Sequence, residues 1–347
     1  MSAAATMSAV VWTGPDAVEV REVPLPEVPD GWALVRVAYN GICGTDLAIV
    51  HGAHPRARHG LVPGHELSGW VERAGASGPG VGELVVARPL ISCGTCRACA
   101  SGSPHVCREL GLYGIDTPGA MADYVALPPE VLHPVPATVD ARTAALAEPL
   151  AVAVHAVALS GLVPGDTVGV LGAGPIGILT ALVARHAGAA RVVLAEPSAW
   201  RRSVAADLGL DVVPEGGTLT GSVRDVTGGE GADVVFDSAG HPAVAPELTT
   251  ATRVLGRIVV VGVHKQPAPI DLRDVCFKEQ TLLGVRVYTT EDVDRAIELL
   301  ASGALGLDRF PTRAFALTDA AAAVEAAAAG TGCLKVLTTP LDGKADA

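Results

Sequence analysis

The chain has 347 residues, of which 49% are hydrophobic and 18% charged, and its formal net charge is −12. This length and composition predict a globular protein of two domains rather than a disordered chain. The negative charge argues against nucleic acid and anionic membranes as partners, because both attract basic surfaces. Charged residues such as Arg142 and Glu148 interrupt the longest apolar stretch, 141–163, so we expect no transmembrane span. The first seven residues lack the apolar core of a secretory signal.

Residues 1–150 predict an irregular β-rich domain. Short runs with strand propensity, at 33–38 and 83–87, are separated by Gly and Pro, and few helices stand out. The pattern changes after Pro164 and Gly165, where apolar strands begin to alternate with Ala-rich helices.

Four cysteines lie within fifteen residues of this first domain: Cys93, Cys96, Cys99 and Cys107. Thiolates at such short separations suit one tetrahedral zinc ion with Zn–S distances of about 2.3 Å. Two disulfides are the alternative, but cysteines three residues apart form strained bridges, and nothing else indicates secretion. Because four sulfurs leave no open position for a substrate, we expect a structural zinc site. The odd total of seven cysteines also fits a reducing cytoplasm.

Residues 151–288 predict a doubly wound parallel sheet, which places the chain in the α/β class. Fully apolar strands separated by helices are typical of a sheet that is covered on both faces. The expected strands are 168–171, 191–195, 212–213, 233–237, 257–261 and 281–284, and the expected helices are 175–186, 198–208, 219–226 and 243–255. Residues 290–337 return to helix, strand, helix and strand, and we expect 289–347 to complete the first domain.

A dinucleotide-binding fingerprint follows the first of these strands. Gly172, Gly174 and Gly177 form a Gly-x-Gly-x-x-Gly motif between a strand and a helix, with Pro175 and Ile176 at the helix start. The first glycine permits a tight turn, the second lets the backbone approach a pyrophosphate, and the third lets the helix pack on the strand. The motif is weak by itself, but this placement indicates phosphates bound at the helix N-terminus.

Glu196 ends the next strand, where a carboxylate would accept hydrogen bonds from both ribose hydroxyls of the adenosine. The same carboxylate would repel a 2′-phosphate, so the sequence favours NAD over NADP. Arg201 and Arg202 keep NADP open as an alternative, although both also fit exposed helix charges.

Three further residues could ligate a second metal ion: Cys43, His65 and Glu148. Taken singly, each has a simpler interpretation. A lone Cys is usually a buried small hydrophobic residue, and a lone His or Glu is usually a core or surface polar group. The residues alone therefore leave this metal role open.

In its motifs the chain resembles the zinc-dependent medium-chain dehydrogenase/reductase family, within the polyol branch of sorbitol, butanediol and threonine dehydrogenases. The motifs are Cys-Gly-Thr-Asp at 43–46, Gly-His-Glu at 64–66, the four cysteines, Glu-Pro-Leu at 148–150, the glycine fingerprint and Lys-Val at 335–336. They occur in the family's order, over nearly the whole chain. Residues 35–47 show a weaker similarity to aminocyclitol dehydrogenases.

The resemblance implies a fold and an assembly. A GroES-like catalytic domain would comprise 1–150 completed by 289–347, and a Rossmann NAD-binding domain would comprise 151–288. The active site would lie in the cleft between them, and the enzyme would be a cytoplasmic homodimer or homotetramer.

The resemblance also implies a ligand set for a catalytic zinc: Cys43, His65 and Glu148. Glu66 would be a carboxylate that can exchange into the ligand shell, and Asp46 would orient the imidazole of His65. One thiolate and one carboxylate neutralise Zn²⁺ and leave a fourth position for an alcohol oxygen. Zinc would act as a Lewis acid while the fold presents the cofactor for hydride transfer. With the four-cysteine site, two zinc ions per chain are expected.

The proton pathway departs from the family's pattern. By resemblance Thr45 accepts the hydroxyl proton, but many relatives also carry a relay His five residues after the ligand cysteine, where this chain has Ala48. His51, one helical turn further on, could substitute for it or could only line a loop. Alternatively, ribose hydroxyls and water could carry the proton directly. On the cofactor side of the active site, Val261 and Arg286 are expected near the nicotinamide ring.

The sequence thus predicts an enzyme that transfers a hydride between a secondary alcohol and NAD(H). Polar groups in two segments that match the family's pocket, 113–116 and 286–288, favour a polyol, cyclitol or amino alcohol. Alternatives are a threonine dehydrogenase-like or NADP-preferring enzyme, a zinc-free reductase of the same fold, and a nucleotide-binding protein without catalysis. The last two predict damage to the ligand set or to Thr45, and these residues are present.

Overall fold

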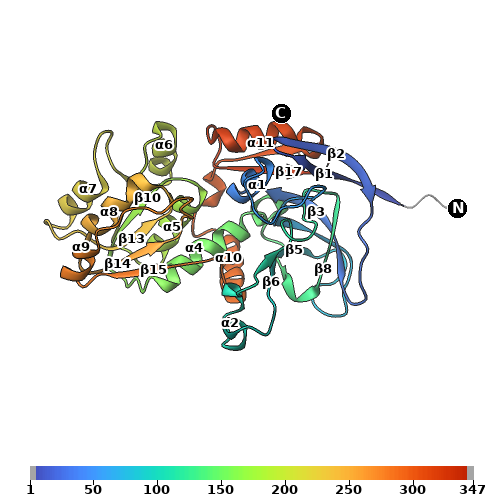
Figure 1. The fold of residues 1–347 in the computed structure, drawn as a ribbon, viewed down its shortest axis with the longest axis horizontal. Coiled ribbons are helices and arrows are strands. Elements are labelled where there is room, and N and C mark those ends of the chain that lie inside the picture. Colours follow the sequence, from blue (N-terminus) through green and yellow to red (C-terminus); the bar gives the residue numbers. More distant parts are fainter. Residues whose placement is uncertain (1–4, 342–347) are drawn as a thin grey trace. The chain divides into compact units, whose positions relative to one another are not determined.

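The structure is a computed structural model that describes residues 5–341, and the chain divides into two compact units (Figure 1). The first unit holds the described residues up to Glu148, residues 289–302, and the described residues from Pro311 onward. The second holds 149–288 and 303–310, where Arg309 donates a hydrogen bond to the carbonyl of Asp207 at 2.8 Å. The assignment of functional domains to 1–150 with 289–347 and to 151–288 stays a prediction.

The second unit is built on a parallel sheet with the strand order β12-β11-β10-β13-β14-β15. Its strands are β10 (Thr167–Leu171), β11 (Arg191–Ala195), β12 (Asp211–Val212), β13 (Ala232–Asp237), β14 (Thr252–Val260) and β15 (Thr281–Gly284). Every residue of β10 is buried, which accounts for its apolar sequence. The chain order reverses between β10 and β13, and doubly wound folds bind ligands at the carboxyl ends of the strands at such a point.

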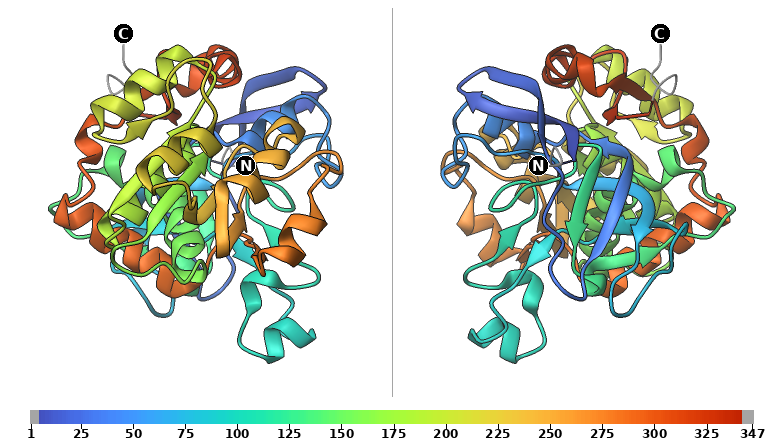
Figure 2. Two further views of the ribbon diagram at one scale, coloured as in Figure 1. Left: turned by 90° about the vertical axis from the view of Figure 1, so that its left-hand side faces the viewer. Right: turned by 90° about the vertical axis from the view of Figure 1, so that its right-hand side faces the viewer.

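Helices cover both faces of this sheet (Figure 2). The helices of this unit are α4 (Ala147–Leu159, which begins in the first unit), α5 (Pro175–His186), α6 (Ala199–Asp207), α7 (Leu219–Val226), α8 (Ala245–Ala251) and α9 (Leu272–Phe277), with the 3₁₀ turns η3 (Pro242–Val244) and η4 (Leu307–Arg309). Helix α5 packs against β10 and β11, and α8 packs against β13 and β14. Right-handed crossovers place these two helices on opposite faces.

Most predicted elements of the second unit are confirmed. The ranges 175–186, 191–195, 219–226 and 281–284 match α5, β11, α7 and β15 residue for residue. The predicted helix 243–255 is wrong at its end, because α8 stops at Ala251 and β14 begins at Thr252. Thr252 pairs with Ala232 of β13, so strand pairing takes over residues that favour a helix by composition.

The first unit contains a mixed sheet in the order β16-β17-β3-β4-β5-β9, with β8 paired to β3, and the two-stranded sheets β1-β2 and β6-β7. Its strands are β1 (Thr6–Gly14), β2 (Ala17–Pro24), β3 (Ala33–Gly41), β4 (Glu66–Arg73), β5 (Leu84–Ala87), β6 (Leu90–Ile91), β7 (Gly111–Leu112), β8 (Tyr124–Leu127), β9 (Leu132–Pro134), β16 (Thr312–Ala316) and β17 (Lys335–Thr339). The β-rich prediction for this part of the chain is confirmed.

The helices of the first unit are short up to residue 148 and longer near the C-terminus. They are α1 (Gly44–Val50), α2 (Arg97–Ala100), α3 (Ala141–Ala144), α10 (Thr290–Ser302) and α11 (Ala320–Ala329), with the 3₁₀ turns η1 (Pro104–Val106), η2 (Pro129–Val131) and η5 (Leu317–Asp319). The predicted order of helix, strand, helix and strand after residue 289 is confirmed. Between residues 5 and 341, none of the helices combines the length and hydropathy that crossing a membrane requires.

Strand β3 organises the first unit. Its buried side chains pack with apolar residues of β4 and β8, and it runs antiparallel to β4, β8 and β17. The end of β3 therefore meets the beginnings of β4 and β17 at one edge of the sheet. At that edge Gly41 pairs with Glu66 on one side and with Leu337 on the other. This edge, called here the β3 edge, carries the candidate metal ligands.

Candidate metal centres and nucleotide site

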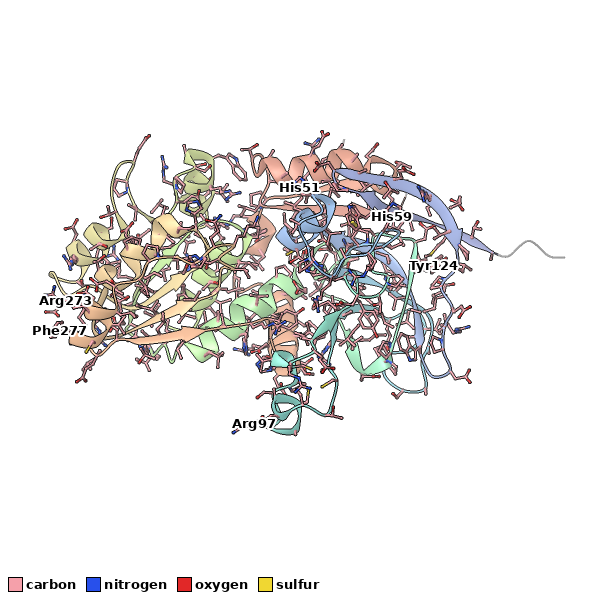
Figure 3. The ribbon with its side chains drawn as sticks, viewed as in Figure 1. His51, His59, Arg97, Tyr124, Arg273 and Phe277 are labelled. Carbon is pink, nitrogen blue, oxygen red and sulfur yellow. The ribbon has the colours of Figure 1, made fainter. Side chains whose placement is uncertain are left out.

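The four cysteines converge in a small lobe between β6 and β7, which includes α2 and is marked by the labelled Arg97 in Figure 3. Their sulfur atoms all lie within 4.8 Å of one another, with Sγ of Cys96 3.5 Å from Cys99 and 3.9 Å from Cys107. These distances far exceed a disulfide bond of about 2.05 Å, and all four cysteines are free. They suit a tetrahedron with Zn–S distances of about 2.3 Å. The lobe therefore fits one zinc ion.

Backbone N–H groups prepare these sulfurs for a metal. The N–H groups of Cys93 and Cys96 donate to Sγ of Cys107 and Cys93, both at 3.3 Å. Hydrogen bonds from the backbone of Thr95 and Cys96 lower the pKa of Cys93 to about 6. Burial, reinforced by neighbouring thiols, raises the pKa of Cys99 to about 12. At neutral pH a cation must therefore displace the proton of Cys99, which couples metal binding to proton release.

A second group of metal-ligating side chains lies at the β3 edge. Cys43, His65 and Glu66 each present one ligand atom, and these atoms lie within 4.8 Å of one another. Cys43 caps the N-terminus of α1, while His65 directly precedes β4. Gly64 allows this approach, since its φ is +103° and a Cβ there would lie 2.8 Å from the side chain of Asn40. A thiol, an imidazole and a carboxylate are a donor set that suits zinc.

Asp46 connects two of these side chains. Its Oδ2 accepts a hydrogen bond from the N–H of Cys43 at 2.8 Å, and its Oδ1 lies 3.5 Å from Nδ1 of His65. Both side chains are buried, and within the described chain neither Oδ1 nor Nδ1 has a hydrogen-bond partner. The imidazole thus turns Nδ1 toward Asp46 and leaves Nε2 for a metal ion. Burial acts to lower the pKa of His65, but Asp46 and Cys43 outweigh it and raise that pKa well above its usual value.

Glu148, the predicted third ligand, lies outside the group of three whose ligand atoms are within 4.8 Å. It belongs to the first turn of α4, and its charge reaches the buried Lys335, as do the charges of Glu66 and Cys43. Glu66 is therefore the carboxylate in direct reach of the thiol, and Glu148 shares with it an electrostatic effect on Lys335.

The residues predicted for proton transfer have different surroundings. The hydroxyl oxygen of Thr45 lies 3.9 Å from Sγ of Cys43, beside the metal-ligating group. His51 follows the last residue of α1, where Figure 3 labels it, and its side chain is 52% exposed. Its Nδ1 lies 2.5 Å from Oδ1 of Asp16. This exposed pair favours the interpretation that His51 lines a loop, and its role as a relay stays a prediction.

Lys335 is a candidate that the sequence marked only as part of a motif. Its side chain is 4% exposed, and Nζ contacts both carboxylate oxygens of Glu66, with Oε1 at 2.5 Å. Burial acts to lower the pKa of Lys335, but the charges of Glu66 and Cys43 outweigh it and raise that pKa. The signal in the sequence was a lone lysine among the apolar residues 333–337, since a buried lysine requires an anionic partner.

A further polar group comprises His54, Arg56 and Asp116. The sequence analysis placed Asp116 in a predicted pocket segment but did not connect it with His54 and Arg56. Arg56 donates to the carbonyl of Leu110 at 2.5 Å and lies 3.4 Å from the carboxylate of Asp116. Burial and then the charge of Arg56 lower the pKa of His54, and the charge of His65 also reaches it. The group therefore lies within electrostatic range of the candidate metal ligands, and it includes Asp116 of the predicted pocket segment 113–116.

The glycine fingerprint has three distinct local environments. Gly172 follows β10 with a φ of +98°, and a Cβ there would lie 3.1 Å from the backbone nitrogen of Ala239. Gly174 caps α5, and nothing lies within 4 Å of the place where its Cβ would be. A Cβ on Gly177 would collide with the carbonyl of Gly172. These environments suit a tight turn, an open approach for a ligand, and close packing of helix and loop.

A cavity of about 750 Å³ lies beside this loop, within the second unit. Helix α5 begins with Pro175 and Ile176, and no side chain caps its first N–H groups. Glu196 follows β11; its Oε2 accepts from the N–H of Ala173 at 2.7 Å and its Oε1 from the N–H of Ser198 at 3.0 Å. The cavity is bordered by Gly172, Gly174, Glu196, Arg201 and Arg202, among others. An uncapped helix N-terminus beside a cavity of this size fits a nucleotide.

The residues predicted at the nicotinamide end follow β14 and β15. The N–H of Val261 donates to the carbonyl of Asp237 at 2.9 Å, and Arg286 is exposed. Their contact with a cofactor stays a prediction. Asp237 itself was missed: its buried carboxylate accepts from the N–H of Gly240 at 3.0 Å and lies 2.6 Å from Nε2 of His264. Asp237 therefore ties together the loops that follow β13 and β14.

Comparisons with known proteins agree with this geometry. Residues 29–137 match the model of the alcohol dehydrogenase GroES-like domain, and residues 175–302 match that of the zinc-binding dehydrogenases. The chain is 44% identical to 2-dehydro-3-deoxy-L-galactonate 5-dehydrogenase of Pseudoalteromonas atlantica, over 82% of this chain and 84% of that relative. The chain belongs to the zinc-dependent medium-chain alcohol dehydrogenases.

Further relatives place the dehydrogenase in the polyol branch of this family. It is 35% identical to erythritol/L-threitol dehydrogenase of Mycolicibacterium smegmatis, over 96% of this chain and 98% of that one. A crystal structure described as a zinc-binding dehydrogenase of Sinorhizobium meliloti bound to NADP matches it with a TM-score of 0.91 and 34% identity, covering 97% and 100% of the two chains. The GroES-like and Rossmann folds are confirmed, and the dehydrogenase transfers hydride between a small-molecule secondary alcohol and a nicotinamide cofactor with zinc.

Replacing Cys107 with Ser should remove the zinc of the four-cysteine lobe. We expect the zinc content of the purified dehydrogenase to fall from about two ions to about one per chain. The midpoint of thermal unfolding should fall as well, because structural zinc contributes its binding free energy to folding. Elemental analysis and differential scanning calorimetry measure both. Cys276, exposed and outside both metal-ligating groups, provides the matched control Cys276→Ser. Full zinc content in Cys107→Ser would contradict the assignment.

The second and third glycines of the fingerprint predict different defects. Gly174→Ala should fold normally, because its methyl group meets no protein atom, but it should weaken NAD binding by about tenfold, equal to about 1.4 kcal/mol. Gly177→Ala should instead lower the unfolding midpoint, because its methyl group collides with a carbonyl. Isothermal titration calorimetry and thermal unfolding separate the two effects. An unchanged Kd in Gly174→Ala would show that the cofactor does not approach this turn.

Proposed function

We propose that Cys43, His65 and Glu148 hold the catalytic zinc of this dehydrogenase, and that Glu66 is a second carboxylate able to reach it. The observation that carries this proposal is the convergence of the thiol of Cys43, the imidazole of His65 and the carboxylate of Glu66 at the β3 edge. Glu148 is added to this set from the resemblance to the family's ligand pattern. When bound, zinc supplies a Lewis acid that lowers the pKa of the alcohol. The thiolate of Cys43 and one carboxylate balance the two charges of the ion. We propose in the same way that the four cysteines of the lobe hold a structural zinc.

The chain's own residues then position groups and move a proton. Thr45, whose hydroxyl lies beside Sγ of Cys43, is placed to accept the proton of the alcohol. Asp46 fixes the orientation of His65 through Nδ1. Because position 48 is alanine, the proton leaves Thr45 through water or through His51.

We propose NAD rather than NADP as the preferred cofactor. The carboxylate of Glu196 lies at the border of the cavity, anchored by two backbone N–H groups. A carboxylate there suits two ribose hydroxyls and repels a 2′-phosphate. Arg201 borders the same cavity, and the Sinorhizobium meliloti relative holds NADP, so both cofactors belong in the test.

We propose that the substrate is a polyhydroxylated secondary alcohol of the sugar or sugar-acid class. The polar group of His54, Arg56 and Asp116, within electrostatic range of His65, supports a polar substrate. A guanidinium also suits a carboxylate, which neutral polyols lack. The 44% identical relative is named for a sugar acid and the 35% identical relative for polyols. Both names agree with a polar, polyhydroxylated substrate.

We propose a cytoplasmic homo-oligomer that forms through β15. This strand is the edge of the parallel sheet, and Leu282 on it is exposed. Leu272 and Phe277 of the adjoining α9 are also exposed, and Figure 3 labels Phe277 beside Arg273 at this end of the second unit. An unpaired edge with apolar side chains is suited to pairing with a second copy. Free cysteines throughout the described chain support a reducing compartment.

A spectrophotometric screen tests the proposed function. Zinc-replete protein is assayed with polyols, cyclitols, sugar acids, amino alcohols and L-threonine, each with NAD and NADP. We expect the highest kcat/KM with NAD and a polyhydroxylated substrate. Cys43→Ser should lose about 1,000-fold or more of this kcat/KM, since zinc contributes several kcal/mol to the reaction, while Cys276→Ser should retain it. Equal activity of the two variants would exclude Cys43 as a ligand, and cofactor binding without turnover of any alcohol would favour a non-catalytic protein.

Replacing Leu282 with Arg should dissociate the proposed oligomer. A charge on the apolar edge strand repels its copy across a two-fold axis and leaves the folded chain intact, because this side chain is already exposed. Sedimentation velocity should show the mass of a monomer. Val226→Arg, at an exposed position on α7, is the control and should keep the oligomer. An unchanged sedimentation coefficient for Leu282→Arg would contradict pairing through β15.

A further inference from the structure

The loop between α1 and β4 carries an excess of positive charge in an acidic protein. Residues 51–59 include two arginines and three histidines and no Asp or Glu, although the whole chain has a formal net charge of −12. Figure 3 labels His51 and His59, the two ends of this segment, which is called here the cationic loop. Arg58 is exposed, and the side chain of Arg56 is 40% exposed. A local excess of positive charge suits an anionic ligand.

Backbone hydrogen bonds hold the cationic loop against α1, whose N-terminus carries a proposed zinc ligand. The N–H groups of Ala53 and His54 both donate to the carbonyl of Ala48, at 2.8 and 3.0 Å. From this anchored turn, the guanidinium of Arg56 donates to the carbonyl of Leu110 at 2.5 Å. Arg56 therefore connects the cationic loop to the segment that follows the four-cysteine lobe.

That segment packs against Gly64, the residue directly before a second proposed zinc ligand. The carbonyl of Gly64 accepts a hydrogen bond from the N–H of Ala120 at 2.9 Å, and a Cβ on Gly114 would collide with the same carbonyl. Asp116 lies two residues after Gly114, and its carboxylate is 3.4 Å from the guanidinium of Arg56. Arg56 and Asp116 are thus held beside the backbone that leads into the proposed metal site.

The guanidinium of Arg56 has N–H groups to offer a ligand. An arginine side chain has several donors in a planar fork. The carbonyl of Leu110 takes one of them, whereas the carboxylate of Asp116, at 3.4 Å, lies beyond the usual N–H···O distance of up to about 3.2 Å. That carboxylate accepts the N–H of Leu112 at 2.8 Å. The remaining donors match a carboxylate, which a guanidinium binds through two parallel hydrogen bonds.

Charge balance also favours an anion at this place. Asp116 offsets one positive charge, but Arg58 adds another, and within residues 5–341 its guanidinium donates to carbonyls of its own loop rather than to an acid. Burial, and next the charge of Arg56, lower the pKa of His54. The imidazole of His54 is therefore uncharged at pH 7 and suits a hydroxyl group. A ligand with one carboxylate and several hydroxyls fits both the charge and the neutral polar groups.

We propose that Arg56 is a specificity-determining residue that binds the carboxylate of a sugar-acid substrate and so selects aldonates over the corresponding neutral polyols. This inference rests on the proposed function, since it takes the zinc at the β3 edge as the place of alcohol oxidation. Arg56 holds a group of the substrate that does not react, so it acts on binding rather than on hydride transfer. Its loss should raise KM for the acid more than it lowers kcat.

The test uses full-length, zinc-replete dehydrogenase with NAD and three substrates of one configuration: an aldonate, its uncharged amide and the alditol. For the native enzyme, kcat/KM should be highest with the aldonate and should fall as ionic strength rises, because the contact joins opposite charges. In Arg56→Met, kcat/KM for the aldonate should fall about 100-fold, mainly through KM, while the values for the amide and the alditol stay within about threefold. Arg56→Lys keeps the charge but loses the planar fork, so its value should lie between the two.

Two control variants separate a direct contact from a general effect of charge. Arg58→Met removes the same charge from the same loop, but from an exposed and screened position, and should change kcat/KM for the aldonate by at most about threefold. Arg21→Met, at an exposed arginine that pairs with Glu19 on β2, should leave every kinetic constant unchanged.

The outcomes distinguish this inference from the proposed function. An unchanged ratio of aldonate to alditol in Arg56→Met, or a native preference for the amide or the alditol, overturns the inference. If Arg56→Met does not fold, the same ratio in Arg56→Lys and the ratio of aldonate to amide in the native enzyme decide the matter. Turnover of neither acids nor neutral alcohols, or full activity in Cys43→Ser, would instead overturn the proposed function.

Discussion

The burial of charged side chains at the end of strand β3 is the constraint on which the candidate active site depends. The strands β4 and β17 both begin there, so Glu66 and Lys335 meet inside the first unit, and the next turn delivers Cys43 at the start of α1. Charges in such a place are tolerated only when each has a partner. Asp46 has the backbone of Cys43, and Glu66 has Lys335. The carboxylates of Asp46 and Glu66 therefore have partners within the protein, and the side chains at the β3 edge leave room for one divalent cation.

The two metal-ligating groups of the first unit suit different roles, one structural and one catalytic. The lobe between β6 and β7 contains only a four-residue helix and a short 3₁₀ turn, too little to bury a core of its own. Four sulfurs with backbone N–H donors suit an ion that replaces that core. The three mixed donors grouped at the β3 edge would leave one position of a tetrahedral ion open, and an open position is what a Lewis acid requires.

In the second unit the proposed dinucleotide site is formed mainly by backbone groups of loops rather than by charged side chains. The sheet order reverses between β10 and β13, and the loop after β10 opens onto a cavity without a side chain at Gly174. The carboxylates of Asp237 and Glu196 accept hydrogen bonds from backbone N–H groups, and these bonds stiffen the loops around this cavity. Rigid loops lower the cost of ordering a flexible dinucleotide.

Much of this protein was determined by local sequence. The fingerprint helix α5 and the strand β11 were predicted residue for residue, because apolar periodicity and glycine placement act over a few residues. Fifteen residues cannot separate four cysteines far, so their spacing alone indicated one metal site. Only the tertiary structure brought Glu66 rather than Glu148 into direct reach of Cys43, and only there does Lys335 pair with Glu66. The end of α8 at Ala251 was likewise decided by strand pairing. These features depend on strand register and on the burial of charge between distant segments, and such contacts leave no periodic pattern in a single sequence.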